Sequence, residues 1–346
     1  MPAPGHDAGA PVTLRDVARV AGVHPGTVSR ALNPASEALV NEETVRRVRD
    51  VAAQLGYRPN PMARGLKTNR TYTVGVLVPD IQNPLFPPII RGIDDRLGAA
   101  GYTPLIANTD NDPERERTDV DAMRARQVDG FITATARRDH ELLDEVARFT
   151  APVVLVNRRV ADGRLPSATA DDREGARLAT RHLIELGHRR IAHVAGPPEL
   201  STGEGRQIGF AEAMREAGLD IDPALVRSGR MFTEPEGARL CAELLDSGAE
   251  FTAIVAANDL MALGCYDVLA ERGIDCPRDV SVVGFNDMPF ADRFQPPLTT
   301  IRVPQYEIGA AAAELLLDLL RDPAAPARDV VLPAELVVRG STGPPR

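Results

Sequence analysis

Apolar residues recur at helical spacing in the segment Thr13–Asn33, TLRDVARVAGVHPGTVSRALN. The spacing predicts two short helices with facing apolar sides, formed by Leu14, Val17, Ala18 and Ala21 in the first and by Val28, Ala31 and Leu32 in the second. Thr13 and Asp16 stand at the capping-box positions of the first helix. Gly22 suits its end, and Pro25 suits the first turn of the second helix.

The outward face of the second predicted helix carries short polar groups and one arginine: Thr27, Ser29, Arg30 and Asn33. A third amphipathic segment, Asn41–Gly56, starts with a good capping residue and buries an aliphatic stripe. An ordinary helical hairpin has the same periodicity as the first two helices. Three short helices with a polar, arginine-bearing outer face instead make a complete helix-turn-helix unit, which reads phosphates and base edges.

A further short helix is predicted directly after Tyr57. Asn60 and Pro61 supply its cap and first residue, and it covers about residues 62–67. Because helix nucleation is costly and Gly65 weakens the segment further, it is too short to be stable alone. A plain linker is the simplest interpretation from the residues alone.

Beyond residue 72, apolar strand-like runs alternate with helical stretches. The predicted strands are Thr73–Val78, Tyr102–Ala107, Gly130–Thr133, Val153–Val156, Ile191–Ala195, Ala253–Ala256 and Ser281–Phe285. The predicted helices are Ile89–Ala100, Pro113–Gln127, Arg173–Leu186, Arg206–Ala217, Glu234–Leu245 and Asp259–Arg272. Continuous apolar strands that alternate with helices are typical of a doubly wound parallel α/β sheet. The length of the pattern predicts two such subdomains around a cleft.

The net charge of −9 conceals a division along the chain. Residues 1–72 carry ten Lys and Arg against six Asp and Glu, whereas the remaining residues carry 30 against 43. The basic charge therefore lies where the predicted DNA-binding unit lies, and phosphate repels the acidic remainder. No apolar run is long enough to span a bilayer, and residues 1–12 lack the apolar core of a signal peptide. We expect residues 1–12 to be disordered and the protein to be cytoplasmic.

Catalytic motifs are absent from the α/β part. Lys67 is the only lysine, so residues 73–346 hold neither a phosphate-loop lysine nor a Schiff-base lysine. The sequence has no GxGxxG fingerprint and no GxSxG elbow. His182 and His188 lack metal-ligand spacing, and we expect a surface pair at a helix C-terminus. Three cysteines, Cys241, Cys265 and Cys276, also lack such spacing and predict reduced thiols, buried in the protein. We predict no enzyme activity, metal or cofactor.

Polar loops follow the predicted strands and favour a binding cleft. They include residues 79–86, Asn108–Asp110, Asn157–Arg158, residues 201–206, Asn258–Asp259 and Asn286–Asp287. In open α/β sheets a ligand binds at the carboxyl ends of the strands, and amide and carboxylate groups suit the hydroxyls of a sugar. Singly, such residues are loop or cap residues, and Asp110, Asp112 and Asp287 could all be N-caps.

The motifs TLRDVARVAGV, TVSRALN and YRPNPMARGLK, with LPAELVVRGSTGPP at the C-terminus, resemble the LacI/GalR family of bacterial transcription regulators. The resemblance implies a helix-turn-helix domain (13–58), a hinge helix and linker (59–72), and an effector-binding and dimerisation domain (73–346). It implies a type I periplasmic-binding-protein-like fold for that domain, with the chain crossing three times between two subdomains. Subdomain one is about 73–171 and 305–332, and subdomain two is about 173–301 and 333–346.

The resemblance also implies roles for single residues. In a dimer on DNA the hinge helices order in the minor groove and Leu66 wedges between base pairs. The residues expected at DNA are Thr13, Leu14, His24, Pro25, Gly26, Thr27, Ser29, Arg30, Asn33, Tyr57, Asn60, Ala63 and Leu66. In the cleft, Arg206 matches an arginine that grips the effector, Asn286 a residue that bonds its hydroxyls, and Phe232 an aromatic wall. Asn83, Phe86, Asn157 and Asn258 match effector-binding positions more loosely.

Three positions depart from the family pattern. His24 occupies the usual serine cap of the second helix, and because histidine caps poorly we expect this end to fray or to contact phosphate. Pro25 and Gly26 occupy positions whose side chains usually discriminate bases, and neither can hydrogen-bond a base. We therefore expect modest discrimination at the base pairs beneath them.

Taken together, the residues and the resemblance predict a dimeric, operator-binding repressor of carbohydrate genes under the control of a sugar-like effector. The expected partners are palindromic double-stranded DNA, a small sugar and a second copy of the chain, with no membrane. A periplasmic-type binding module without a DNA role is the first alternative, and residues 13–67 argue against it. An α/β enzyme is the second alternative, against which the missing lysine and motifs argue.

Overall fold

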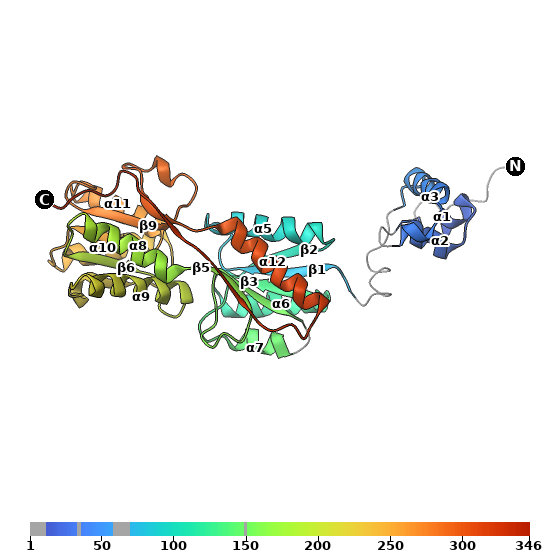
Figure 1. Cartoon of the computed structure of the whole chain (residues 1–346), viewed down its shortest axis with the longest axis horizontal. Coiled ribbons are helices and arrows are strands. Elements are labelled where there is room, and N and C mark those ends of the chain that lie inside the picture. Colours follow the sequence, from blue (N-terminus) through green and yellow to red (C-terminus); the bar gives the residue numbers. More distant parts are fainter. Residues whose placement is uncertain (1–11, 33–35, 58–69, 149–150) are drawn as a thin grey trace. The chain divides into compact units, whose positions relative to one another are not determined.

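The computed structural model describes residues 12–32, 36–57, 70–148 and 151–346. The predicted hinge helix and four residues expected at DNA, Asn33, Asn60, Ala63 and Leu66, lie outside the described residues, as do nearly all of residues 1–12. The chain forms two compact units, residues 1–71 and 72–346, which we call the head and the body (Figure 1).

Helices pack around a small apolar core in the head. They are α1 (Leu14–Ala21), α2 (Pro25–Ala31), the short 3-10 helix η1 (Glu37–Leu39) and α3 (Glu42–Gln54). The capping box at the start of α1 is formed as predicted: the Thr13 backbone N–H donates to Asp16 over 3.0 Å, and the Thr13 hydroxyl accepts from the Asp16 N–H. Gly22 ends α1 in the left-handed conformation, with φ of 66°. Val17, Val28 and Val48 are fully buried where the three α-helices meet.

The expectation that His24 caps α2 poorly was wrong, whereas its contact with phosphate stays a prediction. His24 does cap this helix, because its Nδ1 accepts a 3.0 Å hydrogen bond from the Gly26 N–H. The imidazole bonds forward to the first turn, and Gly26 offers no side chain in its way. Histidine can therefore act here as the short polar caps do, by satisfying one of the free N–H groups of the helix.

Two six-stranded sheets form the body. The first has the order β11-β5-β4-β3-β1-β2 and the second the order β12-β10-β9-β8-β6-β7. The strands are β1 (Thr73–Val78), β2 (Thr103–Asn108), β3 (Gly130–Thr133), β4 (Val153–Val156), β5 (Ser167–Ala170), β6 (Ile191–Ala195), β7 (Val226–Ser228), β8 (Ala253–Ala256), β9 (Ser281–Asn286), β10 (Thr299–Arg302), β11 (Asp329–Leu332) and β12 (Glu335–Val337). Neighbouring strands run parallel, except that β12 pairs antiparallel with β10. Buried positions run without a break along β3, β4, β6, β8 and β9, as expected for parallel strands covered on both faces.

Helices flank both sheets (Figure 1). They are α5 (Phe86–Ala99), α6 (Pro113–Ala125), α7 (Glu141–Arg148), α8 (Asp172–Glu185), α9 (Ser201–Glu216), α10 (Glu234–Asp246), α11 (Asp259–Glu271) and α12 (Gln305–Arg321), with short 3-10 turns η2 (Pro223–Leu225) and η3 (Ala291–Arg293). No helix among the described residues is long and apolar enough to cross a bilayer.

The chain passes between the two sheets three times. It leaves the first sheet after β5 for α8, returns after β10 to α12, and crosses again between β11 and β12. Figure 1 shows α5 and α12 together on the half that holds β1–β3, and α8–α11 on the half that holds β6 and β9. The predicted doubly wound architecture with two parallel-sheet subdomains is confirmed.

Glycines allow pairs of helices to approach at their backbones. A Cβ added to Gly92 of α5 would lie 2.1 Å from the carbonyl oxygen of Tyr306 in α12, and one on Gly309 would lie 2.0 Å from that of Ile89. In the second half, a Cβ on Gly237 of α10 would lie 2.3 Å from the Met261 carbonyl oxygen in α11. Glycine is therefore required for the close contact of these helices.

Of the two histidines expected at the surface, His188 is buried and His182 is half-buried. His188 is 1% exposed, with Nδ1 2.8 Å from the Thr252 hydroxyl and Nε2 2.9 Å from the Gly343 carbonyl oxygen. His182 contacts the Thr342 hydroxyl through Nε2, at 2.9 Å. The surface expectation was therefore wrong for His188, because the C-terminal segment returns over this helix end and contacts both rings through Thr342 and Gly343. Cys241 and Cys265 are buried as expected, while Cys276 is only half-buried.

Candidate functional site

A cavity of about 780 Å³ lies between the strand ends of the two halves of the body. Residues that follow β1, β2, β3 and β4 line it from the first sheet, and residues that follow β6, β7, β8 and β9 line it from the second. All seven residues expected to bind the effector line it: Asn83, Phe86, Asn157, Arg206, Phe232, Asn258 and Asn286. Its position at the carboxyl ends of parallel strands and its size are those of a small-molecule site.

Arg206 is the best-anchored charged group in the cavity. It is 4% exposed and donates from Nε to Oδ1 of Asp172 over 2.8 Å, and from Nη1 to the Ala257 carbonyl oxygen over 2.6 Å. Its guanidinium carbon lies 3.8 Å from the centroid of the Phe285 ring and 5.5 Å from that of Phe232. These contacts hold the guanidinium plane in one orientation, with Nη2 3.5 Å from Oδ1 of Asn286.

The segment that carries Arg206 is helical, which corrects the expected loop over residues 201–206. Helix α9 begins at Ser201, so Arg206 projects from its second turn and not from a loop. A rigid element therefore positions this side chain. Asp172, its partner, begins α8, and burial raises the pKa of this carboxyl above its usual value, against the opposing effect of Arg206.

The asparagines of the cavity differ in the hydrogen bonds that their side-chain amides already make within the protein. Asn258 caps α11 by accepting from the Met261 N–H over 2.8 Å, and its Nδ2 donates to the Phe232 carbonyl oxygen over 3.2 Å. Asn157 and Asn286 have positive φ of 64° and 111°. Non-glycine residues in this region concentrate at ligand sites, and here they turn the chain sharply just where β4 and β9 end.

The loop after β1 ends at the start of α5. The Asn83 side chain accepts from the Leu85 N–H over 3.0 Å, which fixes the turn, and Phe86 is the first residue of α5 and is 2% exposed. Because Phe86 faces the cavity from a buried position, it contributes an apolar wall. The amide of Asn83 is partly committed to its own loop.

The sequence left open whether Asp110, Asp112 and Asp287 are helix N-caps, and the structure shows that only Asp112 is one. Asp112 caps α6 through the Glu114 N–H at 2.9 Å. Asp110 instead pairs with Arg115, and Asp287 pairs with Arg302 at 2.8 Å and Arg339 at 2.6 Å, so neither is a cap.

Sequence reasoning missed several charged groups in the cavity. Arg137, Arg230 and Glu199 line it and were not expected there, and Arg158 was only noted as part of a polar loop. Arg158 is 5% exposed, and its Nε has no hydrogen-bond partner among the described residues. Burial and the nearby Arg137 lower the pKa of Arg158 to about 10. No sequence signal shows whether an arginine will find a carboxylate partner after folding.

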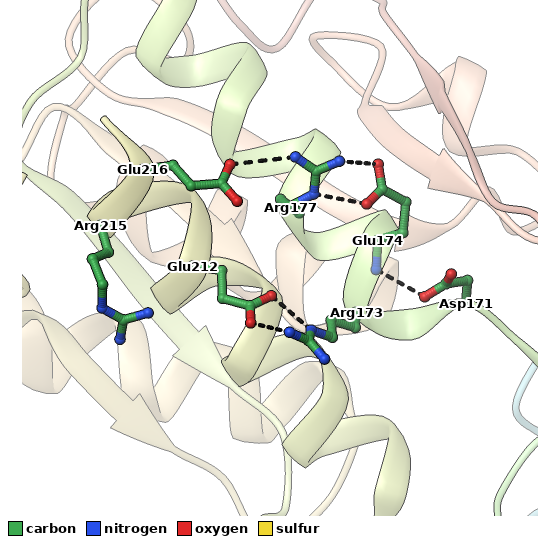
Figure 2. Close-up of a pocket in the computed structure, with 7 residues that line it drawn as sticks. All are labelled: Asp171, Arg173, Glu174, Arg177, Glu212, Arg215 and Glu216. Atoms are coloured by element: carbon green, nitrogen blue, oxygen red, sulfur yellow. Dashed lines mark hydrogen bonds and ion pairs between the residues drawn. The ribbon is translucent and has the colours of Figure 1, made fainter. Parts of the chain in front are cut away.

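A second hollow lies on the outer face of α8 and α9 (Figure 2). Its walls are ion pairs. Arg173 with Glu212, and Arg177 with Glu216 at 3.3 Å, join the two helices, and Arg177 also pairs with Glu174 at 2.7 Å within α8. These groups satisfy one another; Arg173 is exposed and Arg177 is partly buried. The hollow holds the two helices together and offers no buried, unsatisfied group to a ligand.

The head presents the side chains expected at DNA in two environments. Arg30 is exposed and Thr27 and Ser29 are half-buried on α2, which begins at Pro25. Leu14 and Tyr57 instead pack against the apolar core of the head. Thr13 is exposed and occupied by its cap with Asp16.

Comparison with known protein families gives two matches. Residues 13–60 match the lacI family of bacterial regulatory proteins, and residues 180–342 match the periplasmic binding protein-like domain. The chain is 38% identical over 333 residues to the HTH-type transcriptional regulator RegA of Clostridium saccharobutylicum, covering 95% of this chain and 99% of RegA. It is 36% identical over 331 residues to the HTH-type transcriptional repressor CytR of Escherichia coli strain K12, covering 95% and 96%.

Solved structures with the same architecture include complexes with ligand or DNA. The lac repressor dimer bound to operator and the anti-inducer ONPF matches with a TM-score of 0.83 at 29% identity, covering 96% of this chain and all of that chain. The complex of the transcriptional regulator CelR with cellobiose matches with a TM-score of 0.74 at 33% identity, covering 95% and 99%. A LacI family regulator from Enterococcus faecium with bound ribose matches with a TM-score of 0.70 at 32% identity, covering 79% of this chain and all of that chain.

Proposed function

The chain belongs to the lacI family of bacterial regulatory proteins, and we propose that it represses carbohydrate-utilisation genes until a sugar-like effector binds in the cavity of its body. As a member of that family it is a DNA-binding transcription regulator. One observation carries the proposal: a single chain joins a complete helix-turn-helix head to a body whose cavity is lined by all seven expected effector residues. A module that only bound a small molecule would not need the head.

The sugar class of the effector is supported by the chemistry of the cavity and by relatives. Amide groups, a fixed guanidinium and two phenyl rings provide paired donors and acceptors together with apolar surfaces, which is what the two sides of a sugar ring require. Related regulators have been solved with cellobiose and with ribose.

Control of DNA binding follows from the placement of the cavity. Its walls come from both halves of the body, which are joined by three chain crossings, so a ligand that contacts both walls favours one relative arrangement of the halves. We infer that the chain acts as a dimer. The ligand-bound arrangement of the halves then differs from the ligand-free one in how well it holds the two heads on a palindromic operator. Coupling of this kind is reciprocal, so operator DNA must lower the affinity for an inducing ligand by the same factor.

A binding assay with the full-length chain tests the function. A fluorescent palindromic duplex with a central CpG step, with half-sites selected from a random pool, should bind at least about a thousandfold more tightly than a scrambled duplex. Arg30→Ala should weaken binding by about 1–3 kcal/mol. Arg293→Ala, which removes a side chain that is 78% exposed on the body, is the matched control and should have no effect.

Two outcomes separate the parts of the proposal. Equal affinity for selected and scrambled duplexes at low salt contradicts sequence-specific DNA binding altogether. Specific binding that no mono- or disaccharide changes contradicts only the sugar effector.

A further inference from the structure

Two buried polar groups without partners face the same cavity from opposite halves of the body. The Nε of Arg158, after β4, has no hydrogen-bond partner among the described residues, and neither has the hydroxyl of Thr202, in the first turn of α9. Arg158 is 5% exposed and Thr202 is 2% exposed, so water does not readily replace the missing partners. Both side chains line the cavity.

Backbone contacts bring these two groups to one place. The Arg159 N–H donates to the Ser201 hydroxyl over 2.9 Å, and the Arg138 N–H donates to the Glu199 carbonyl oxygen over 2.9 Å. The neighbours of Arg158 and Thr202 are therefore joined directly. The α9 N-terminus lies at the same place, and its cap residue Leu200 has no side chain that could accept from the first N–H groups.

The charges around Arg158 do not neutralise it. Arg206 is paired with Asp172, and Asp110 is paired with Arg115. Asp80 accepts from the Gln82 N–H over 2.9 Å in its own turn. Arg137 lies near enough to oppose the charge of Arg158, and Glu116 and Glu199 favour that charge without a hydrogen bond or ion pair to it among the described side chains.

We propose that Arg158, Thr202 and the N-terminus of α9 form a subsite for an acidic group, so that the effector is a sugar-sized polyol that carries a carboxylate or a phosphate. This inference rests on the proposed effector role of the cavity and names the chemical class of its ligand. A guanidinium, a hydroxyl and free N–H groups at a helix N-terminus are a combination that oxyanions prefer. The rest of the cavity, with its amides and phenyl rings, holds the polyol part.

The proposed subsite should lower the stability of the ligand-free protein, and this effect can be measured without any ligand. A buried guanidinium with no partner destabilises the fold, and removing its charge relieves that cost. Arg158→Gln should therefore raise the midpoint of thermal unfolding of the ligand-free, full-length protein. If Arg158 served only to pair with Glu199, Arg158→Gln would instead lower the midpoint, and this result would overturn the proposal.

Inorganic phosphate is the probe that does not depend on the identity of the sugar. At matched ionic strength, phosphate should raise the unfolding midpoint of the wild-type protein more than chloride does. The effect should be lost in Arg158→Gln and reduced in Thr202→Val, which keeps the shape but removes the hydroxyl. Arg293→Gln is the control, because Arg293 is 78% exposed and does not line the cavity. An equal effect of phosphate on wild type and Arg158→Gln shows an adventitious ion only and overturns the subsite.

Sugar ligands then distinguish carboxylate from phosphate. In calorimetric titrations, gluconate or glucose 6-phosphate, or the corresponding derivatives of ribose, should bind at least about tenfold more tightly than the neutral sugar, and Arg158→Gln should remove that preference. A neutral sugar that binds as tightly as both of its acids and releases the operator overturns this inference but leaves the proposed function intact. Failure of every sugar and derivative to bind contradicts both.

Discussion

Nε of Arg206 donates to Oδ1 of Asp172 over 2.8 Å, and the two charges lie almost completely buried where α8 and α9 meet the cavity. The guanidinium also rests on the Phe285 ring and bonds the Ala257 carbonyl oxygen. A cation that is already held on three sides costs little additional ordering when a ligand binds to its remaining edge. The pair therefore contributes both to the stability of the body and to the affinity for a ligand, because it holds the guanidinium in its binding orientation before the ligand arrives.

A double-mutant cycle on this pair separates the two roles. Arg206→Gln should destabilise the body by about 3–5 kcal/mol because it leaves Asp172 as a buried, unpaired carboxylate, and it should abolish effector binding. Asp172→Asn should cost a similar amount by leaving the arginine alone. The double variant should recover part of the loss in the free energy of unfolding but none of the binding, as measured by chemical denaturation and calorimetry. Additive losses of stability would show that the pair is not coupled.

The pH dependence of stability should reflect two buried groups with opposite effects. Burial raises the pKa of Asp259 to about 7 and lowers that of His193 to about 4. Between the unfolded pKa of Asp and pH 7, folded Asp259 keeps a proton that the unfolded chain releases, so its contribution makes stability fall as pH rises. Between pH 4 and 6.5 the unfolded chain binds a proton that folded His193 refuses, so its contribution makes stability rise with pH.

Single variants should expose each slope. Asn in place of Asp259 can still accept from the Met288 N–H and can donate to Thr300, so Asp259→Asn should keep the fold. It should remove a fall of roughly 4 kcal/mol between pH 4 and 7 and uncover the rise due to His193. His193→Asn, which keeps a donor for the Val255 carbonyl oxygen, should uncover the opposite slope. Urea titrations across this range test both; identical profiles for the two variants would contradict the assignment.

Two glycines in one helix should respond in opposite directions to the same substitution. Gly92→Ala should destabilise the body by several kcal/mol, at least about 3, because the added methyl group would meet the Tyr306 carbonyl oxygen at 2.1 Å and push α5 away from α12. Gly98 lies in the same helix with nothing within 4 Å of an added Cβ. Gly98→Ala should therefore stabilise the body by about 0.5–1 kcal/mol through helix propensity. Denaturant titrations of the two variants, side by side with wild type, measure both effects.

The parts of this fold that could be predicted are those whose pattern is local. β1, β3, β4, β6 and β8 were predicted with the bounds they have, because each is a continuous apolar run between polar loops. The edge strands β7, β11 and β12 were not predicted, since their burial alternates or is only partial and their pairing depends on distant partners. The inner strands β5 and β10 were also missed, because their Ser, Thr and Ala residues form no apolar run, and so were helices α7 and α12. The start of α9 was missed because Ser, Thr and two glycines favour a loop locally, and only contacts with the neighbouring loops make this segment helical.

The features of the candidate site also divide into those that the sequence predicted and those that it did not. Polar residues after successive strands pointed correctly to one cavity, because parallel strands bring their carboxyl ends to one edge. The isolation of Arg158 could not be predicted, since it depends on which carboxylates other arginines occupy. For His24, sequence rules misjudged the cap because they treat residues one at a time, whereas a side chain at residue 26 would crowd the imidazole that caps α2.

That dependence between His24 and Gly26 yields a prediction about DNA readout. An added Cβ at Gly26 would lie 3.1 Å from His24 Nδ1, the atom that caps the helix. Gly26→Gln alone should therefore disturb the start of α2, lower the stability of the head and weaken operator binding. In His24→Ser/Gly26→Gln a short serine cap leaves room for the glutamine, whose amide can bond the edge of adenine in the major groove.

The double variant should thus restore affinity and gain about 1–3 kcal/mol of discrimination at the base pair beneath residue 26, where the wild type has little. Selection from duplexes randomised at each position of the half-site measures the change, and His24→Ser alone controls for the cap. If the double variant selects the same half-site as the wild-type protein, residue 26 does not face a base. The base contacts would then begin later along α2, at the exposed Arg30.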